Sequence, residues 1–155
     1  MTQVAARTER APIKAAVIGY GYWGPHMARN ISQIPGFELT AVVDFSVARR
    51  RAAEEALPGT PTFASLNEML ETCAVNAVVI ATPTNSHHDL AAQCIDGGLH
   101  AIIEKPLTTS VASAKQLVHS AKERGTVLMV DHTYCYSSPV NYMKHLVMNL
   151  SLIHI

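Results

Sequence analysis

The sequence predicts an α/β fold built on a doubly wound parallel sheet. Five short apolar runs rich in valine and isoleucine alternate along the chain with segments of helical period. Several of these runs are apolar at consecutive positions, which is typical of strands covered by helices on both faces. Because a helix separates successive strands, we expect the strands to run parallel and to be joined by right-handed crossovers.

Each expected element has a local signal. The expected strands are residues 13–18, 37–43, 74–81, 100–103 and 127–130. Pro25 suits the first turn of a helix that carries an apolar stripe. Serines at expected N-caps and glycines at expected C-termini delimit most of the remaining helices. The expected caps and the helices that they open are Ser46 for 47–56, Ser65 for 66–72, Ser86 for 90–95 and Ser110 for 111–124, with a further amphipathic helix at 141–147.

Composition and charge exclude several classes of function. The chain has 155 residues, about one domain, with 48% hydrophobic residues and equal numbers of basic and acidic side chains, 12 of each. No basic field is available to attract nucleic acid or an anionic membrane, so neither is an expected partner. Three widely spaced cysteines match neither a disulfide framework nor a metal cluster. We therefore expect no metal and a cytoplasmic location.

The two ends of the chain differ in character from its middle. Residues 1–12 lack the apolar segment of a signal peptide and are expected to form a flexible tail. Residues 13–149 are expected to form the folded domain. Residues 150–155 are expected to be a non-native tail, because the codons that encode them could come from a transposon-end adapter used to prepare sequencing libraries.

A glycine-rich turn follows the first expected strand and reads Gly-Tyr-Gly-Tyr-Trp-Gly. In a turn between a strand and a helix, Gly19 permits the sharp bend, Gly21 lets a pyrophosphate approach the backbone, and Gly24 lets the helix lie near the sheet. The helix then directs unpaired N–H groups at the phosphates. The turn predicts the Rossmann dinucleotide-binding fold. Tyr22 and Trp23 are expected beside the cofactor, with a role in packing as the alternative.

An aspartate at the end of the second expected strand indicates which dinucleotide is bound. Asp44 lies 20 residues after Gly24, where an acidic side chain reaches the adenosine ribose. Its carboxylate can accept hydrogen bonds from both ribose hydroxyls and would repel a 2′-phosphate, so NAD is the predicted cofactor. NADP stays open as an alternative, because one arginine of the run 49–51 could reach a 2′-phosphate. The other interpretation of that run is a solvated helix face.

Two later motifs complete a family resemblance. Ala-Thr-Pro at 81–83 is followed by His87, and Glu-Lys-Pro-Leu stands at 104–107, both at expected carboxyl ends of strands, where ligands bind. With the glycine turn, and in this order, these motifs resemble the Gfo/Idh/MocA family, which includes glucose-fructose oxidoreductase and inositol dehydrogenase. The segment 130–139 is similar to members that act on sugars, often nucleotide sugars. The resemblance covers about residues 13–149.

The resemblance implies roles for individual residues. Lys105 corresponds to the catalytic lysine beside the nicotinamide, where an ammonium group would stabilise a developing alkoxide. Thr82, Pro83 and Glu104 would lie at the cofactor site, and His87 would have a cofactor-binding or structural role. The substrate would be a sugar, nucleotide sugar or polyol.

The same resemblance implies parts that this sequence lacks. A second α/β domain would carry the substrate pocket and a histidine acting as general base, and the full-length protein would be a homo-oligomer. We therefore expect this chain to be inactive alone. Two alternatives remain open: a stand-alone NAD(H)-binding or redox-sensing module without turnover, and a lyase or hydrolase that borrows the hydride and returns it.

Overall fold

A computed structural model describes residues 11–149 of the chain. Its centre is a six-stranded sheet in the order β3-β2-β1-β4-β5-β6, and every neighbouring pair is parallel. The predicted doubly wound parallel sheet is confirmed. The strands are β1 (Ile13–Ile18), β2 (Phe37–Val43), β3 (Thr62–Phe63), β4 (Ala77–Ile80), β5 (His100–Glu104) and β6 (Leu128–Asp131).

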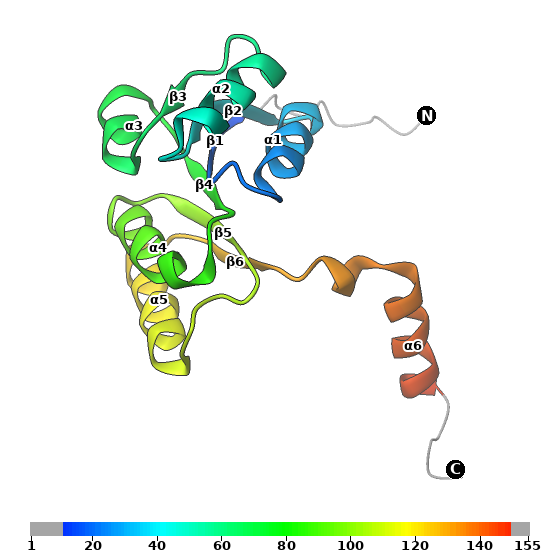
Figure 1. Ribbon diagram of the computed structural model, residues 1–155. Coiled ribbons are helices and arrows are strands. Elements are labelled where there is room, and N and C mark those ends of the chain that lie inside the picture. The colour runs from blue at the N-terminus through cyan, green and yellow to red at the C-terminus, as the bar shows by residue number, and fades with distance from the viewer. Residues whose placement is uncertain (1–10, 150–155) are drawn as a thin grey trace, which may run out of the picture.

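Helices connect the strands, as Figure 1 shows. The α-helices are α1 (Gly24–Gln33), α2 (Val47–Ala56), α3 (Leu66–Thr72), α4 (His87–Asp96), α5 (Val111–Arg124) and α6 (Ser138–Asn149), and the short 3-10 helices are η1 (Thr84–Ser86) and η2 (Thr133–Tyr136). The reversal of strand order falls between β1 and β4, which is the switch point at which ligands bind in such sheets.

The consecutive apolar positions of the central strands are explained by two separate cores. Ala16, Ile18, Val78 and Ile80 face one core together with side chains of α3, α4 and α5. Their neighbours along the strands, such as Val17 and Val79, face a second core with side chains of α1 and α2. Because adjacent strand residues point to opposite faces, helices on both faces require an unbroken apolar run.

Three of the predicted N-caps are confirmed. The hydroxyls of Ser46, Ser65 and Ser110 accept hydrogen bonds from backbone N–H groups three residues ahead. The prediction that the Ser86 side chain caps the following helix is wrong. The 3-10 turn η1 puts Ser86 in helical backbone geometry, so its side chain makes no cap hydrogen bond and α4 begins at His87.

The structure also corrects the number of strands. The two-residue strand β3 pairs with the end of β2 and was not among the predicted apolar runs. Such a short strand has no periodic pattern of its own, and its place is set by backbone hydrogen bonds from Val42 and Asp44 to Pro61 and Phe63.

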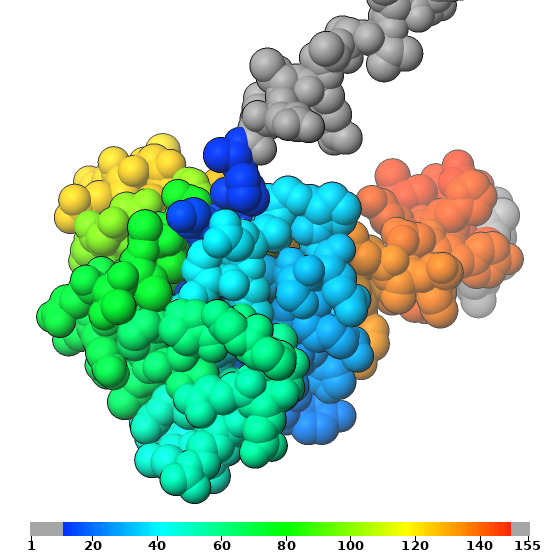
Figure 2. Space-filling model, turned by 90° about the horizontal axis from the view of Figure 1, so that it is seen from above, coloured from blue at the N-terminus to red at the C-terminus, as the bar shows by residue number. Residues whose placement is uncertain are grey.

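The C-terminal part of the described chain leaves the sheet after β6. It passes through η2 into α6, which stands apart from the rest of the domain in Figures 1 and 2. Among residues 11–149 no helix combines the length and hydropathy needed to cross a bilayer. The predictions for residues 1–10 and for the tail 150–155 lie outside the described residues.

Candidate functional site

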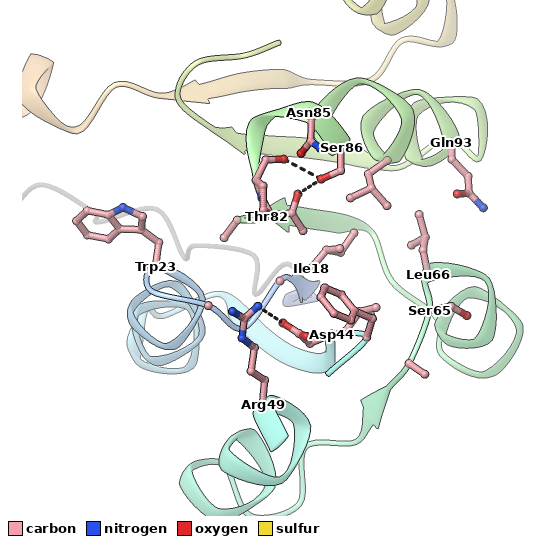
Figure 3. Close-up of a pocket in the computed structure, with 18 of the residues that line it drawn as sticks. Ile18, Trp23, Asp44, Arg49, Ser65, Leu66, Thr82, Asn85, Ser86 and Gln93 are labelled. Carbon is pink, nitrogen blue, oxygen red and sulfur yellow. Dashed lines mark hydrogen bonds and ion pairs between the residues drawn. The ribbon is translucent and has the colours of Figure 1, made fainter. Parts of the chain in front are cut away.

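A cavity of about 760 Å³ opens at the carboxyl edge of the sheet. Its walls come from the segments that follow β1, β2, β3 and β4, so it straddles the switch point of the strand order. Figure 3 shows Asp44 and Arg49 on one side, Thr82 and Ser86 on the opposite side, and Trp23 and Gln93 at the two ends. This is the site at which the sequence predicted a ligand.

The glycine turn forms the corner of this cavity. Gly19 has a φ of +94°, and a Cβ there would lie 2.8 Å from the Thr82 methyl group. A Cβ on Gly24 would lie 2.1 Å from the Gly19 carbonyl oxygen. Gly21 differs, because the nearest atom to a Cβ there is 3.8 Å away, in the Arg49 guanidinium. Two glycines are therefore required by the protein's own packing, whereas Gly21 leaves open space on the cavity side.

Asp44 is buried beneath this corner, with 4% of its surface exposed. One carboxylate oxygen accepts a hydrogen bond from the Tyr20 backbone N–H at 2.7 Å, and the other accepts from the Ser46 N–H at 2.8 Å. Each oxygen keeps lone-pair capacity, because a carboxylate accepts about four hydrogen bonds. The carboxylate thus lies against the cavity in a fixed orientation, with room to accept hydroxyl donors.

The three arginines after Asp44 have different surroundings. Arg50 donates hydrogen bonds to the Asp44 and Phe45 carbonyl oxygens at 2.8 and 3.0 Å, so its guanidinium holds the loop together. Arg49 lines the cavity, and its guanidinium lies 3.6 Å from the Asp44 carboxylate. Arg51 is exposed and does not line the cavity. Of the run that the sequence left open, Arg49 is the residue that lines the cavity.

The opposite wall is the turn after β4. Thr82 and Pro83 line the cavity, as do Asn85 and Ser86. The Ser86 hydroxyl lies 2.8 Å from both the Thr82 hydroxyl and the Pro83 carbonyl oxygen, within donating distance of either (Figure 3). This turn therefore presents hydroxyl and amide groups to the cavity from a compact, internally bonded loop.

Lys105 and Glu104 occupy the next strand end. Lys105 is exposed and is joined to Pro106 by a cis peptide bond. Glu104 is 7% exposed and is paired in register with Asp131 of β6. Burial raises the pKa of the Glu104 carboxyl and the negative charge of Asp131 raises it further, while the Lys105 ammonium acts in the opposite direction. Neither residue lines the cavity itself.

His87 is the first residue of α4 and is 1% exposed. Its Nε2 lies 2.8 Å from the Thr82 carbonyl oxygen and its Nδ1 lies 2.9 Å from the Pro106 carbonyl oxygen. The imidazole therefore contacts both turns that carry the predicted site residues and has no surface facing the cavity.

Aromatic side chains gather at the mouth of the site. The rings of Tyr22 and Trp23 meet edge to face with centroids 5.2 Å apart, and the His26 ring lies 5.7 Å from that of Trp23. Tyr22 is 80% exposed and Trp23 44% exposed. The sequence analysis identified Tyr22 and Trp23 but not His26. The spacing of His26, three residues after Trp23 and four after Tyr22, could have indicated that it lies beside them.

Several cavity residues belong to no ligand-binding motif that the sequence could reveal. They come from the segment after β2, from the start of α3 and from α4, and they are Phe45, Ser65, Leu66, Asn67, Leu90 and Gln93. The side chains of Asn67 and Gln93 are hydrogen-bonded to each other and join α3 to α4 at that end. These residues are separated in the sequence, and it is the fold of the chain around the switch point that brings them to one cavity.

The residues present suit a dinucleotide. Open space over Gly21 admits a pyrophosphate, the N-terminus of α1 lacks a side-chain cap, and Asp44 offers carboxylate oxygens at the end of β2. Fold and site together define the chain as an α/β domain of the dinucleotide-binding class.

Comparisons with known proteins identify the family. Residues 13–132 match the family model described as the oxidoreductase family with an NAD-binding Rossmann fold, Gfo/Idh/MocA. The chain belongs to this family, as its motifs predicted.

Individual relatives agree with this assignment. The chain is 39% identical over 114 residues to the inositol 2-dehydrogenase of Arthrobacter sp. (strain FB24), covering 73% of this chain and 34% of that enzyme. It is similar to the crystal structure of myo-inositol 2-dehydrogenase from Lactobacillus plantarum, with a TM-score of 0.82, 25% identity, and 89% and 41% of the two chains covered. The WlbA dehydrogenase of Bordetella pertussis, solved with NADH and UDP-GlcNAcA, gives a TM-score of 0.83 at 27% identity, with 88% and 42% covered. The chain thus spans about a third to two fifths of the length of these relatives.

Proposed function

We propose that the chain is the NAD(H)-binding part of an oxidoreductase that transfers hydride between the nicotinamide and a secondary hydroxyl or keto group. The proposed substrate is a sugar, nucleotide sugar or polyol. Support for the substrate class comes from relatives named inositol 2-dehydrogenase and from a WlbA structure that contains a nucleotide sugar. Residues 13–149 are proposed as the dinucleotide-binding unit.

One observation carries the proposal. The cavity at the switch point joins open space over Gly21 to a buried carboxylate, Asp44, which is held by two backbone N–H groups and keeps free acceptor capacity. A dinucleotide carries both a pyrophosphate, which would fit over Gly21, and a ribose diol, which Asp44 could bind. The two features together therefore match such a ligand. Tyr22 and Trp23 at one end, and Thr82 and Pro83 on the opposite wall, are proposed as further cofactor contacts.

The choice between the two nicotinamide cofactors follows from charge. Asp44 would repel a 2′-phosphate placed against it, and its position leaves that site to a free hydroxyl. Arg49, 3.6 Å from the same carboxylate, moderates this repulsion without removing it. NAD is therefore the proposed cofactor, with NADP binding more weakly.

Lys105 is the proposed catalytic residue. NAD, when bound, supplies the hydride acceptor. The ammonium group of Lys105 would lie beside the reacting carbinol oxygen and stabilise its developing negative charge. Glu104, directly before Lys105 and 7% exposed, is proposed to hold the turn that carries the lysine. His87 is proposed to support the cofactor site from beneath the turn after β4.

We further propose that the complete enzyme is a cytoplasmic homo-oligomer. The three cysteines of this chain are free thiols, which is typical of a reducing compartment. We expect little or no turnover from the 155-residue chain alone, since it spans 34% of the length of the inositol 2-dehydrogenase that it matches.

The test is a titration of the chain with NADH, followed by the fluorescence of Trp23, the single tryptophan. We expect saturable binding that Asp44→Asn weakens about tenfold or more, because a hydrogen bond to a charged group contributes about 1.5–3 kcal/mol. Glu38→Gln, which removes an exposed carboxylate of β2, is the matched control and should bind as the parent does. Equal binding by all three proteins, or none by the parent, would overturn the proposal.

A further inference from the structure

The two turns that carry the proposed site residues lie on neighbouring strands. Thr82 follows β4 and Lys105 follows β5, and these strands are paired as far as Ile80 and Ile103. Beyond those residues the sheet no longer fixes the spacing of the turns. A side-chain contact between the turns would therefore help to hold the lysine relative to the cofactor wall.

His87 supplies such a contact. Its ring lies between the two turns, with Nε2 at 2.8 Å from the Thr82 carbonyl oxygen and Nδ1 at 2.9 Å from the Pro106 carbonyl oxygen. Pro106 directly follows Lys105, so one of these acceptors belongs to the residue next to the lysine. Among the described residues His87 is the one buried histidine, at 1% exposure.

Both partners are acceptors, which makes the ring a donor. A neutral imidazole carries one N–H and the doubly protonated ring carries two, so His87 donates to at least one of the two carbonyls in either state. A buried carbonyl that loses its donor is costly, so the ring stabilises the turns in this relative position. Both nitrogens face main-chain carbonyl oxygens and the ring is buried, so neither nitrogen is accessible to a substrate as a base.

We propose that His87 is a positioning residue that ties the turn carrying Lys105 to the turn that walls the cofactor cavity. The proposal goes beyond general support of the cofactor site, because it assigns each ring nitrogen to one turn. The functional consequence of these contacts depends on the proposed catalytic role of Lys105. The contacts themselves can be tested without substrate or turnover.

Two substitutions separate the two contacts. The side-chain amide nitrogen of asparagine lies near the position of Nδ1, whereas that of glutamine lies near the position of Nε2. His87→Asn therefore offers a donor to the Pro106 carbonyl and none to Thr82. His87→Gln offers a donor to the Thr82 carbonyl and none to Pro106. A role in packing alone predicts that each variant affects both segments together, because a cavity at a buried site loosens both turns.

The experiment is amide hydrogen exchange of the 155-residue chain, read by mass spectrometry over segments 82–86 and 105–110. We expect exchange about tenfold faster in the segment whose carbonyl loses its donor, a factor that corresponds to roughly 1.4 kcal/mol. That segment is 105–110 for His87→Gln if Nδ1 carries the proton and 82–86 for His87→Asn if Nε2 does, and a doubly protonated ring predicts both effects. His119→Gln, which changes an exposed histidine of α5, should alter neither segment. Equal acceleration of both segments in both variants, or no acceleration, overturns the proposal.

A second measurement applies if a variant does not fold. The unsubstituted chain should show a histidine ring N–H resonance protected from exchange with water, as expected for a buried donor, and its absence would overturn the proposal. Failure here is distinguishable from failure of the proposed function. The proposed function fails if NADH does not bind, and the role of Lys105 fails if Lys105→Met in the complete enzyme keeps full turnover.

Discussion

Glu104 and Asp131 are paired in register at the carboxyl ends of β5 and β6, so two carboxyl groups lie side by side next to Lys105. Glu104 is almost fully buried. Burial raises its pKa above the ordinary value of 4.5, and the Asp131 charge adds to the shift. A charged Glu104 therefore destabilises the folded state relative to a neutral one.

The pH dependence of stability follows from that direction. A carboxyl whose folded pKa is raised contributes stability that is fully present below its unfolded pKa and is lost as the pH rises through the folded pKa. Glu104→Gln removes this loss, and its amide can donate a hydrogen bond to Asp131. We expect the substitution to raise Tm at pH 7 to 8, and the increase to shrink as the pH falls toward 4. Thermal unfolding followed by circular dichroism across that range measures the effect.

Glu123→Gln is the control for this prediction. Glu123 is an exposed residue of α5, with 65% of its side chain accessible, so its charge is solvated in both states. Its substitution should change Tm little at any pH. A decrease in Tm for Glu104→Gln at pH 7 would contradict the assigned direction of the Glu104 shift.

Local features of this site could be predicted from the sequence because they depend on neighbours along the chain. The glycine turn, the strand before it and Asp44 twenty residues later are read from spacing alone. The N-caps at Ser46, Ser65 and Ser110 are likewise interactions across three residues. Each of these elements formed where the pattern placed it.

Other features depend on contacts that no local pattern encodes. The burial of His87 follows from its contact with Pro106, 19 residues away. The pairing of Glu104 with Asp131 depends on strand register across a crossover helix. Arg49 and Arg50 are adjacent in α2 and chemically identical, yet the position of the helix beside the Asp44 loop commits Arg50 to backbone carbonyls and leaves Arg49 at the cavity. Such distinctions appear only once the chain is folded.

The two arginines should separate binding from stability. Arg49→Ala removes the cation that faces the cavity, so NADPH binding should weaken about tenfold while NADH binding changes less than about threefold. Arg50→Ala removes two hydrogen bonds to the Asp44 loop and should lower the free energy of unfolding by about 1–2 kcal/mol. Titrations with both cofactors and denaturant unfolding of both variants measure these effects. Unchanged NADPH binding by Arg49→Ala would show that Arg49 does not contact a 2′-phosphate.

The three thiols should differ in reactivity. Burial raises the pKa of the Cys94 thiol to about 12, whereas Cys135 is exposed. Because the thiolate is the nucleophile, the fraction of Cys94 in the reactive thiolate form should be roughly a thousandfold smaller than that of an ordinary thiol. Burial of the side chain also excludes reagents. Alkylation of the native chain at pH 8 should label Cys135 rapidly and Cys94 only after unfolding. Labelling of Cys94 at the rate of Cys135 would contradict its position in the core.

Gly21→Ala and Gly24→Ala test whether the glycine turn serves a ligand or only the fold. A Cβ at position 24 would lie 2.1 Å from the Gly19 carbonyl oxygen, so this variant should lose about 3 kcal/mol of stability or more. A Cβ at position 21 meets nothing closer than 3.8 Å, so Tm should stay within a few degrees. NADH binding should nevertheless fall at least about tenfold in Gly21→Ala, because the methyl group occupies the space proposed for the pyrophosphate. A Gly21→Ala chain that binds NADH as the parent does would place the phosphates elsewhere.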